Sequence, residues 1–324
     1  MRLSIAFTGF AGLDSTLPAV LAADAAGLDG VWVAEHIGFH DAVVPSAVYL
    51  RATRRLEVGA VGLSTAGRHP GLTAMELLSL SEIAPGRVRV AVGTGDPGLV
   101  AKLGRKLVKP VESVRAFVTA LRQALRGSDL KIAYPEFAFD GFRAMPFGPP
   151  PPIDVMAIRP RMTKLAAEIG DGLSISVGAS RTYIRDAVAA VERELAAAGR
   201  ERAAYRVSAL AIGVIADDLD AACAPVQAMF AMFPQATAEI LARGVVEPGS
   251  LVAAEKKGPM AVMKMWPRSA IAEVALVSTP SDLGNALASY AETGIDELAL
   301  ILVGEPGTHP EIVRRLAAAR PPRR

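Results

Sequence analysis

The dipeptide Glu35-His36 directly follows Gly30-Val31-Trp32-Val33-Ala34, an apolar stretch of the kind that forms a buried strand. A carboxylate and an imidazole cannot stay unpaired in a core, so we expect them at the strand end, where they could transfer protons or bind a ligand. His36 is equally compatible with a hydrogen-bonded structural histidine, and Glu35 with an ion-pair partner that supports a neighbouring group. The pair indicates a site only if other polar residues gather beside it.

Two further polar stretches follow apolar runs in the same way. Arg68-His69-Pro70 comes after the run 56–64 and is compatible with an anion or aromatic-ring contact, and equally with a capped loop entering a helix. Gly93-Thr94-Gly95-Asp96 follows the run 87–92 and lacks the Gly-Lys-Ser/Thr sequence of a phosphate loop. Its glycines suit a planar ring lying close to the backbone, and Asp96 suits proton transfer or a loop cap.

The composition argues against several classes of function. The 35 basic and 33 acidic residues give a net charge of +2, which leaves no basic face for nucleic acid. Asp24 and Asp29 interrupt the apolar region 17–33, so we expect no membrane span. The four histidines show no tight metal-ligand spacing, and no Gly-x-Ser-x-Gly nucleophile motif is present. The single cysteine, Cys223, has no disulfide partner, and the simplest setting is a reducing cytoplasm.

Eight strand-like runs alternate with helical segments, which predicts a (β/α)8 barrel formed as one domain by residues 1–324. The expected strands are 2–8, 30–34, 56–64, 87–92, 153–158, 172–177, 205–215 and 297–303. In a parallel barrel the carboxyl ends of the strands meet at one rim, so the polar stretches above are expected to converge there.

Two insertions interrupt the strand and helix rhythm. The first, about 128–152 after the fourth strand, is rich in Pro, Phe and Gly and suggests a small hairpin plus a loop. Its phenylalanines either face the pocket or pack the hairpin. The second, 217–278 after the seventh strand, is expected to be mostly helical, with methionines that face its core rather than form a lid over substrate.

The rim motifs, taken together and in order, resemble the bacterial luciferase-like flavin-dependent family. The motifs are Val31-Trp32-Val33-Ala34-Glu35-His36, Arg68-His69-Pro70, and Gly93-Thr94-Gly95-Asp96 with Leu103-Gly104-Arg105. Pro160-Arg161-Met162 and Gly294-Ile295-Asp296-Glu297-Leu298 are similar to the deazaflavin (coenzyme F420) branch, which includes methylenetetrahydromethanopterin reductase. The resemblance covers about 2–303 and implies a (β/α)8 barrel, often dimeric, with the cofactor ring at the C-terminal rim.

The resemblance also implies roles for particular residues. His36 would contact the ring or the substrate near the hydride-transferring carbon, and Asp96 would occupy the place of an acidic catalytic group. Gly62, Leu63 and Ser64 would back the ring, in a strand where the family commonly has a non-proline cis peptide. The other cofactor-binding residues implied are Glu35, His69, Gly93, Thr94, Gly95, Ile158, Arg159 and Arg161.

Two residues depart from the deazaflavin pattern. Many of these relatives have Asp at the position of Glu35. Several flavin mononucleotide (FMN) monooxygenases have Glu there. Ile158-Arg159-Pro160 replaces the usual Gly-Pro beside the cofactor phosphate, so Arg159 would supply that contact by its side chain, or the phosphate site is altered.

From these observations we expect an oxidoreductase that moves a hydride between coenzyme F420 and a small organic substrate. One alternative is a two-component monooxygenase that uses FMN. Another is a non-catalytic barrel that binds a flavin or deazaflavin. We expect a cytoplasmic homodimer, and neither the substrate nor the direction of hydride transfer follows from the sequence.

Overall fold

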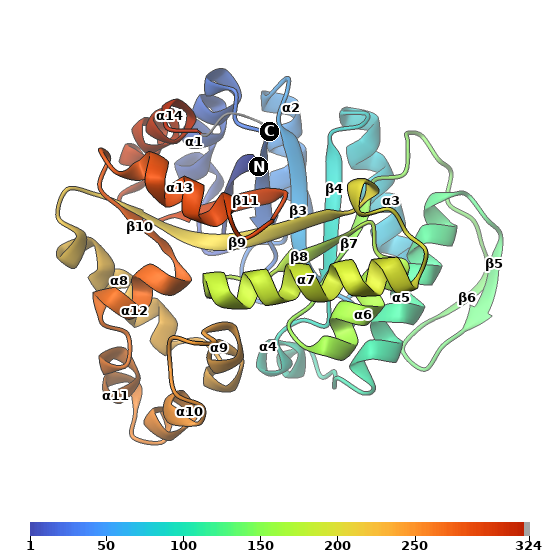
Figure 1. The fold of residues 1–324 in the computed structure, drawn as a ribbon. Coiled ribbons are helices and arrows are strands. Elements are labelled where there is room, and N and C mark those ends of the chain that lie inside the picture. The colour runs from blue at the N-terminus through green and yellow to red at the C-terminus, as the bar shows by residue number, and fades with distance from the viewer. Residues whose placement is uncertain (321–324) are drawn as a thin grey trace.

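The computed structural model describes residues 1–320 and contains a closed barrel of eight parallel strands (Figure 1). The strands are β1 (Arg2–Phe7), β2 (Gly30–Ala34), β3 (Glu57–Ser64), β4 (Val88–Gly93), β7 (Ile153–Met156), β8 (Gly172–Ile175), β9 (Arg206–Ile215) and β11 (Glu297–Leu302). They pair in the order β9-β11-β1-β2-β3-β4-β7-β8, and the pairing of β8 with β9 closes the barrel. The predicted (β/α)8 barrel is confirmed.

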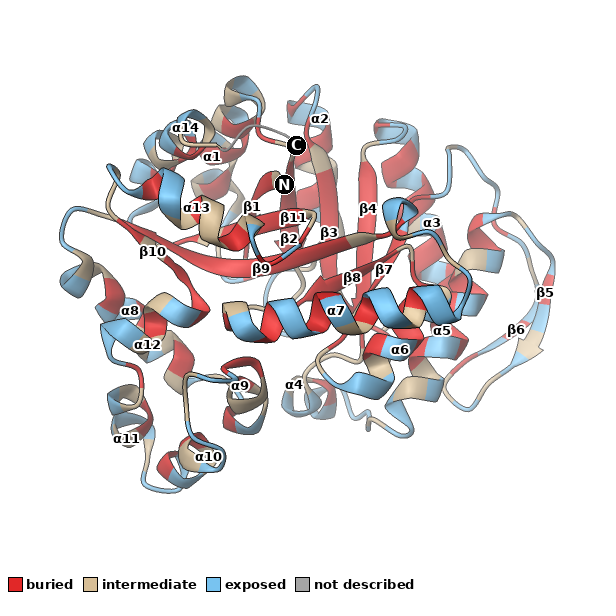
Figure 2. Ribbon diagram, viewed as in Figure 1, coloured by how far each residue is buried: buried red, intermediate tan, exposed pale blue. Residues whose placement is uncertain are grey.

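Helices surround the barrel, and most bury one face against it while the other faces solvent (Figure 2). They are α1 (Leu13–Ala26), α2 (Val43–Ala52), α3 (Pro70–Ile83), α4 (Pro97–Lys102), α5 (Pro110–Leu125), α6 (Pro160–Ile169), α7 (Arg181–Ala197), α13 (Leu283–Ala291) and α14 (His309–Ala318), with short turns η1 (Arg202–Ala204) and η2 (Pro306–Thr308). Several begin with proline, because the first helical position needs no amide hydrogen.

Trp32 fills the centre of the barrel. Its side chain is 1% exposed, and its Nε1–H donates to a carboxylate oxygen of Glu297 over 3.0 Å. Gly59 on the neighbouring strand makes room for the indole, since a Cβ there would lie 2.3 Å from the Trp32 ring. Small and branched side chains, including Ala91 and Leu210, complete this apolar layer.

Charged side chains close the N-terminal end of the barrel. Arg2, Glu57, Arg206 and Glu297 are the first residues of β1, β3, β9 and β11, and they form one network of ion pairs. Glu297 also accepts a hydrogen bond from Ser4 Oγ at 2.5 Å. Because these groups occupy this end of the barrel interior, we expect the site at the opposite rim, as in other parallel barrels.

A second buried ion pair lies beside this network. Arg89 donates to both carboxylate oxygens of Asp154 at 2.6 Å, and the two side chains are 6% and 0% exposed. Burial raises the pKa of Asp154 to about 6, although Arg89 acts in the opposite direction. The pair joins β4 to β7, where the first insertion separates the two strands in sequence.

The first insertion forms an antiparallel hairpin, as expected, from β5 (Leu130–Ala133) and β6 (Ala138–Phe142) (Figure 1). Phe137 and Phe139 are buried and pack against His69, so these rings stabilise the hairpin rather than face a pocket. Phe147 is 68% exposed.

The second insertion is helical, as expected, and has its own hydrophobic core. Its helices are α8 (Leu219–Ala231), α9 (Gln235–Leu241), α10 (Ser250–Glu255), α11 (Pro259–Lys264) and α12 (Arg268–Val274). Phe230 stacks on Trp266 with ring centroids 4.6 Å apart at the centre of this core. The expectation of core-facing methionines was wrong for Met232 and Met260, which are 77% and 66% exposed, because these aromatic and aliphatic side chains fill the interior.

Three local expectations need correction. A ninth parallel strand, β10 (Leu276–Ser278), pairs with the end of β9 inside the segment expected to be helical. The strands expected at 153–158 and 172–177 end at Met156 and Ile175. No cis peptide is present among residues 1–320; β3 instead contains a bulge at Gly62, whose φ of 83° suits glycine.

Candidate active site at the C-terminal rim

The strand order places the predicted site residues side by side. β2, β3, β4 and β7 are consecutive in the sheet, so the stretches that follow their carboxyl ends meet at one rim. This rim lies at the bottom of Figure 1, near α4, and the N-terminus lies at the other end of the barrel. The expected convergence of the polar stretches is therefore present.

His36 is half-buried at the end of β2, and the loop after β1 fixes its orientation. The backbone N–H of Gly9 lies 3.1 Å from His36 Nδ1, closer than the Ala34 carbonyl at 3.4 Å. This geometry favours the tautomer in which Nδ1 accepts from Gly9 and the neutral ring carries its proton on Nε2. Nε2 has no hydrogen-bond partner among the described residues. Burial lowers the pKa of His36, against smaller opposing effects of the Ala34 carbonyl and Glu35. Burial and the Gly9 contact both favour the neutral ring, whose Nε2–H is available to a ligand.

Two exposed phenylalanines lie close to His36, one of them in contact with its ring, and the sequence analysis did not single them out. The ring of Phe10 lies 4.4 Å from the His36 ring between centroids, and Phe39 meets Phe10 edge-on at 4.6 Å. The only sequence signal for them is a large aromatic residue in each of two glycine-containing loops that follow adjacent strands.

Glu35 forms an ion pair with the arginine of the Arg68-His69-Pro70 motif. Arg68 Nε donates to the two carboxylate oxygens at 3.0 and 2.9 Å, and Arg68 Nη1 pairs with Glu76 at 2.6 Å. Burial raises the pKa of Glu76, with Arg68 acting against it. Of the roles considered for Glu35, the structure shows the ion-pair partner, and a cofactor contact stays a prediction.

Gly62, Leu63 and Ser64 form the bulged end of β3. A Cβ at Gly62 would meet only backbone atoms of Glu35, at 3.5 and 3.7 Å, so this part of the rim presents backbone rather than side chains. Leu63 is buried, and Ser64 Oγ donates to the Thr94 carbonyl at 2.9 Å. Gly95 packs directly on Ser64, since a Cβ there would lie 2.5 Å from Ser64 Oγ. The Ser64–Thr94 hydrogen bond and the packing of Gly95 on Ser64 hold the loops after β3 and β4 together.

Asp96 caps α4, which was the structural alternative considered for it. Its Oδ1 accepts a hydrogen bond from the backbone N–H of Leu99 at 2.9 Å. The residue is half-buried and lies beside Gly93, Thr94 and Gly95 at the end of β4. A catalytic role for Asp96 remains a prediction.

His69 does not present a free ring nitrogen to the rim. Its Nδ1 accepts from the N–H of Gly71 at 3.1 Å, which caps α3, and its Nε2 lies 3.2 Å from the Ala138 carbonyl. The imidazole therefore fixes the hairpin to α3. A cofactor contact by His69 would require one of these two bonds to break.

The residues expected near a cofactor phosphate surround the start of α6. The Ile158 carbonyl accepts from the Tyr183 hydroxyl at 2.7 Å, which fixes the backbone after β7. Arg159 is the exposed N-cap residue of α6 and has no ion-pair partner among the described residues. Arg161 is 80% exposed and lies 3.7 Å from Glu112 of α5. Both guanidinium groups are accessible to an anion from solvent.

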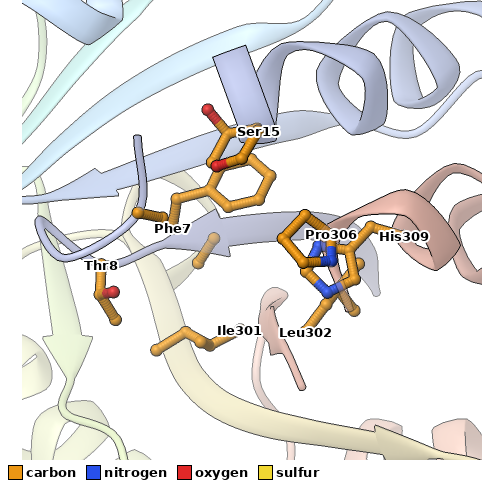
Figure 3. A pocket seen from close by; sticks show the side chains of 10 residues that line it. Phe7, Thr8, Ser15, Ile301, Leu302, Pro306 and His309 are labelled. Carbon is orange, nitrogen blue, oxygen red and sulfur yellow. The ribbon is translucent and has the colours of Figure 1, made fainter. Parts of the chain in front are cut away.

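Two hollows are present among the described residues, and the first borders the loop that carries Gly9 and Phe10. A cavity of about 60 Å³ is enclosed by the end of β1, the end of β11 and the start of α14 (Figure 3). Figure 3 shows His309 beside Pro306 at its wall. His309 is 7% exposed, and neither ring nitrogen makes a hydrogen bond of normal geometry. An open hollow of about 490 Å³ lies at the N-terminal end of the barrel, near Arg89 and Asp171.

Among residues 1–320, no group of three or more His, Cys, Asp and Glu side chains is placed to hold a metal ion. In the same range, no helix is both long and apolar enough to cross a membrane.

A parallel barrel with an oriented histidine and a glycine bulge at its C-terminal rim defines a class of cofactor-binding barrel enzymes. The luciferase-like monooxygenase family model matches residues 5–297, and the chain belongs to this family. The family is described as luciferase-like monooxygenases, and the relatives named below are reductases.

Two relatives with known names are 5,10-methylenetetrahydromethanopterin reductases. The enzyme of Archaeoglobus fulgidus is 29% identical over 201 residues, 62% of this chain and 60% of the relative. The enzyme of Methanolobus tindarius is 23% identical over 290 residues, 88% of each chain. The first match thus spans about three fifths of that relative's length.

A solved structure with a similar fold is the coenzyme F420-dependent tetrahydromethanopterin reductase of Methanopyrus kandleri. It superposes with a TM-score of 0.82 over 98% of both chains, at 17% sequence identity. At this identity the similarity supports the fold alone.

Proposed function

We propose that the chain transfers a hydride between coenzyme F420 and a small organic substrate at the C-terminal rim of the barrel. The observation that carries the proposal is His36, held neutral with a free Nε2–H beside the Gly62 bulge. Two further relatives, 29% and 30% identical, are named as F420-dependent enzymes, which supports F420 over FMN.

The rim residues fit a planar ring. At Gly62 only backbone atoms of Glu35 lie within 4 Å of a Cβ position, so no side chain at this point stands between the strand and a flat ligand. Leu63 and Ser64 would back the ring from β3, and Gly93, Thr94 and Gly95 would border it from β4. Glu35 supports this bulge through its backbone, because its N–H donates to Val61 at 2.8 Å.

The accessible arginines suit the anionic part of the cofactor. Arg159 and Arg161 lie in the first turn of α6 or just before it, where exposed backbone N–H groups also favour negative charge. Arg159 replaces by its side chain the backbone donors that a Gly-Pro sequence would offer. Ile158 would border the same region.

When bound, the deazaflavin supplies hydride exchange at its C5, while His36 acts on the substrate. A neutral imidazole with its proton on Nε2 donates a hydrogen bond to a substrate oxygen and orients the carbon that gains or loses the hydride. Of the two roles considered for His36, proton donor and orienting group, this geometry favours the orienting role. Asp96 holds α4 and the loop after β4 in place around it.

The test is cofactor-dependent turnover of a substrate panel by the purified protein and by two variants. We expect His36→Ala to reduce turnover by roughly 10²-fold or more, as for loss of a group that acts on the reacting atoms, and Asp96→Ala to have a smaller effect. Unchanged turnover in both variants would contradict these assignments.

Two alternatives have distinct outcomes in the same assays. A two-component FMN monooxygenase, which the family description favours, would bind reduced FMN and consume oxygen. A non-catalytic barrel would bind one of the cofactors without turning over any substrate in the panel.

We also propose a cytoplasmic homodimer that binds no nucleic acid. Exposed Val44, Leu72 and Met75 on the adjacent helices α2 and α3 offer an apolar surface for a second copy. The free, buried Cys223 suits a reducing compartment. Light scattering combined with size exclusion would measure the oligomeric state, and a monomer at micromolar concentration would contradict the dimer.

A further inference from the structure

The two loops that hold Phe10 and Phe39 are joined by backbone hydrogen bonds. The N–H of His40 donates to Gly9 at 3.1 Å, and the N–H of Phe39 donates to His36 at 2.9 Å. Gly9 allows this close approach, because a Cβ there would lie 2.8 Å from the His40 carbonyl oxygen. The two phenylalanines are therefore held on a single unit of structure, with Phe10 against the His36 ring and Phe39 against Phe10.

The rings of this aromatic pair, Phe10 and Phe39, are not part of the hydrophobic core. They are 56% and 63% exposed, although each could bury most of its area in a packed interior. They contact each other edge-on, and Phe10 also contacts His36. Large apolar side chains that stay exposed beside a polar reactive group are typical of a surface that a ligand covers.

The charge around the pair limits what that ligand can be. The loops 8–12 and 37–41 contain no lysine or arginine. Asp41, the acidic residue of the second loop, caps α2 by accepting from the N–H groups of Val43 and Val44. Arg68, on the neighbouring loop after β3, is already paired with Glu35 and Glu76. A phosphate or carboxylate at this position would find no unpaired lysine or arginine on these loops, where His40 is the one residue that can become cationic.

We propose that Phe10 and Phe39 form the substrate-binding wall of the site and select a neutral, largely apolar molecule whose one oxygen meets His36 Nε2–H. Cyclic or aromatic ketones and the corresponding alcohols have this chemistry, whereas phosphorylated sugars and carboxylates do not. The inference rests on the proposed function for the role of His36. Phe10 is also a positioning residue, because it covers one side of the imidazole.

The test follows binding at His36 directly, independently of turnover. The Cε1–H resonance of His36 is recorded by NMR while the protein, with and without F420, is titrated with cyclohexanone or with glucose 6-phosphate. We expect a saturable shift with cyclohexanone and none at the same concentrations of glucose 6-phosphate. Phe10→Ala and Phe39→Ala should each weaken cyclohexanone binding by up to roughly tenfold, the upper value for one aromatic contact.

Matched variants separate binding from folding. Phe10→Leu keeps an apolar side chain and should retain most of the affinity. Phe147→Ala removes an equally exposed ring from the loop before β7 and should leave the affinity unchanged. Equal binding of both probes, unchanged affinity in Phe10→Ala and Phe39→Ala, or an equal loss in Phe147→Ala would overturn the proposal. So would a change of oligomeric state in the phenylalanine variants without a change in cyclohexanone affinity.

The two proposals can fail separately. F420 and FMN titrations of the same samples test the proposed function, because absence of F420 binding would refute it. The cyclohexanone titration of the cofactor-free protein still reports on the aromatic pair in that case.

Discussion

Replacing Gly9 with alanine tests whether the loop after β1 holds His36 in its neutral form. The new Cβ would lie 2.8 Å from the His40 carbonyl oxygen and 3.0 Å from His36 Cβ. The first contact involves backbone and cannot be relieved by a side-chain rotation, so the two loops must move apart. We expect the 3.1 Å hydrogen bond from the Gly9 N–H to His36 Nδ1 to be lost.

The size and sign of the effect follow from that single bond. The Gly9 N–H can donate to the neutral ring but not to the imidazolium, whose Nδ1 carries a proton, so the bond lowers the pKa of His36. A hydrogen bond contributes about 0.5–1.5 kcal/mol, and 1.36 kcal/mol corresponds to one pH unit, so its loss raises the pKa by roughly 0.4 to 1.

The assay is an NMR pH titration of the His36 Cε1–H resonance in the folded protein. Gly12→Ala is the matched control in the same loop, because its Cβ would meet only Ser15 Oγ at 3.9 Å and its φ is −71°. We expect Gly9→Ala alone to raise the pKa of His36. An unchanged pKa in Gly9→Ala, or an equal rise in Gly12→Ala, would refute the role assigned to the loop.

Three further predictions concern stability. Arg68→Ala leaves the Glu35 carboxylate, 10% exposed, without its cation and should lower the free energy of unfolding by about 3 kcal/mol in urea titrations; a change below about 0.5 kcal/mol would show that the pair is weak. Asp154→Leu should lower the free energy of unfolding by a similar amount, because it leaves the Arg89 guanidinium buried without its partner. Adding Arg89→Met to the same chain should restore much of the loss. Additive losses in the double variant would contradict the assignment of these two residues as a pair. Burial lowers the pKa of His309 below its value in the unfolded chain, so on acidification the unfolded state binds the proton first. The free energy of unfolding of the wild-type protein should therefore fall relative to that of His309→Leu as the pH drops below about 6.5. Parallel stability curves for the two proteins from pH 8 to 5 would disprove this.

Much of the barrel follows from the sequence because its strands are short apolar runs bounded by glycine and polar residues. The run that ends in Glu35-His36 is the barrel strand β2. The polar stretch 93–96 follows β4, which is separated from β2 in the sheet by β3 alone. Parallel pairing then forces these ends to the same rim without any knowledge of side-chain contacts. The three-residue strand β10 has no comparable signal, because its pairing with β9 depends on tertiary packing.

The contacts within the site depend on loop geometry that no local pattern specifies. Gly9 and His36 are 27 residues apart, and their bond exists because two loops approach within van der Waals distance. Arg68 was compatible with binding an anion, and only the fold shows that Glu35 and Glu76 neutralise it. The exposure of Phe10 likewise follows from where its loop lies, since a phenylalanine in sequence predicts burial.

The central claim is that this barrel binds F420 at the rim formed by β2, β3 and β4. Titration of the purified protein with F420 and, separately, with FMN, followed by the fluorescence of each cofactor, tests it most directly. We predict saturable binding of F420, weakened when Gly62→Val places a side chain on the bulge, and much weaker binding of FMN. Tight FMN binding with no binding of F420 would contradict the account.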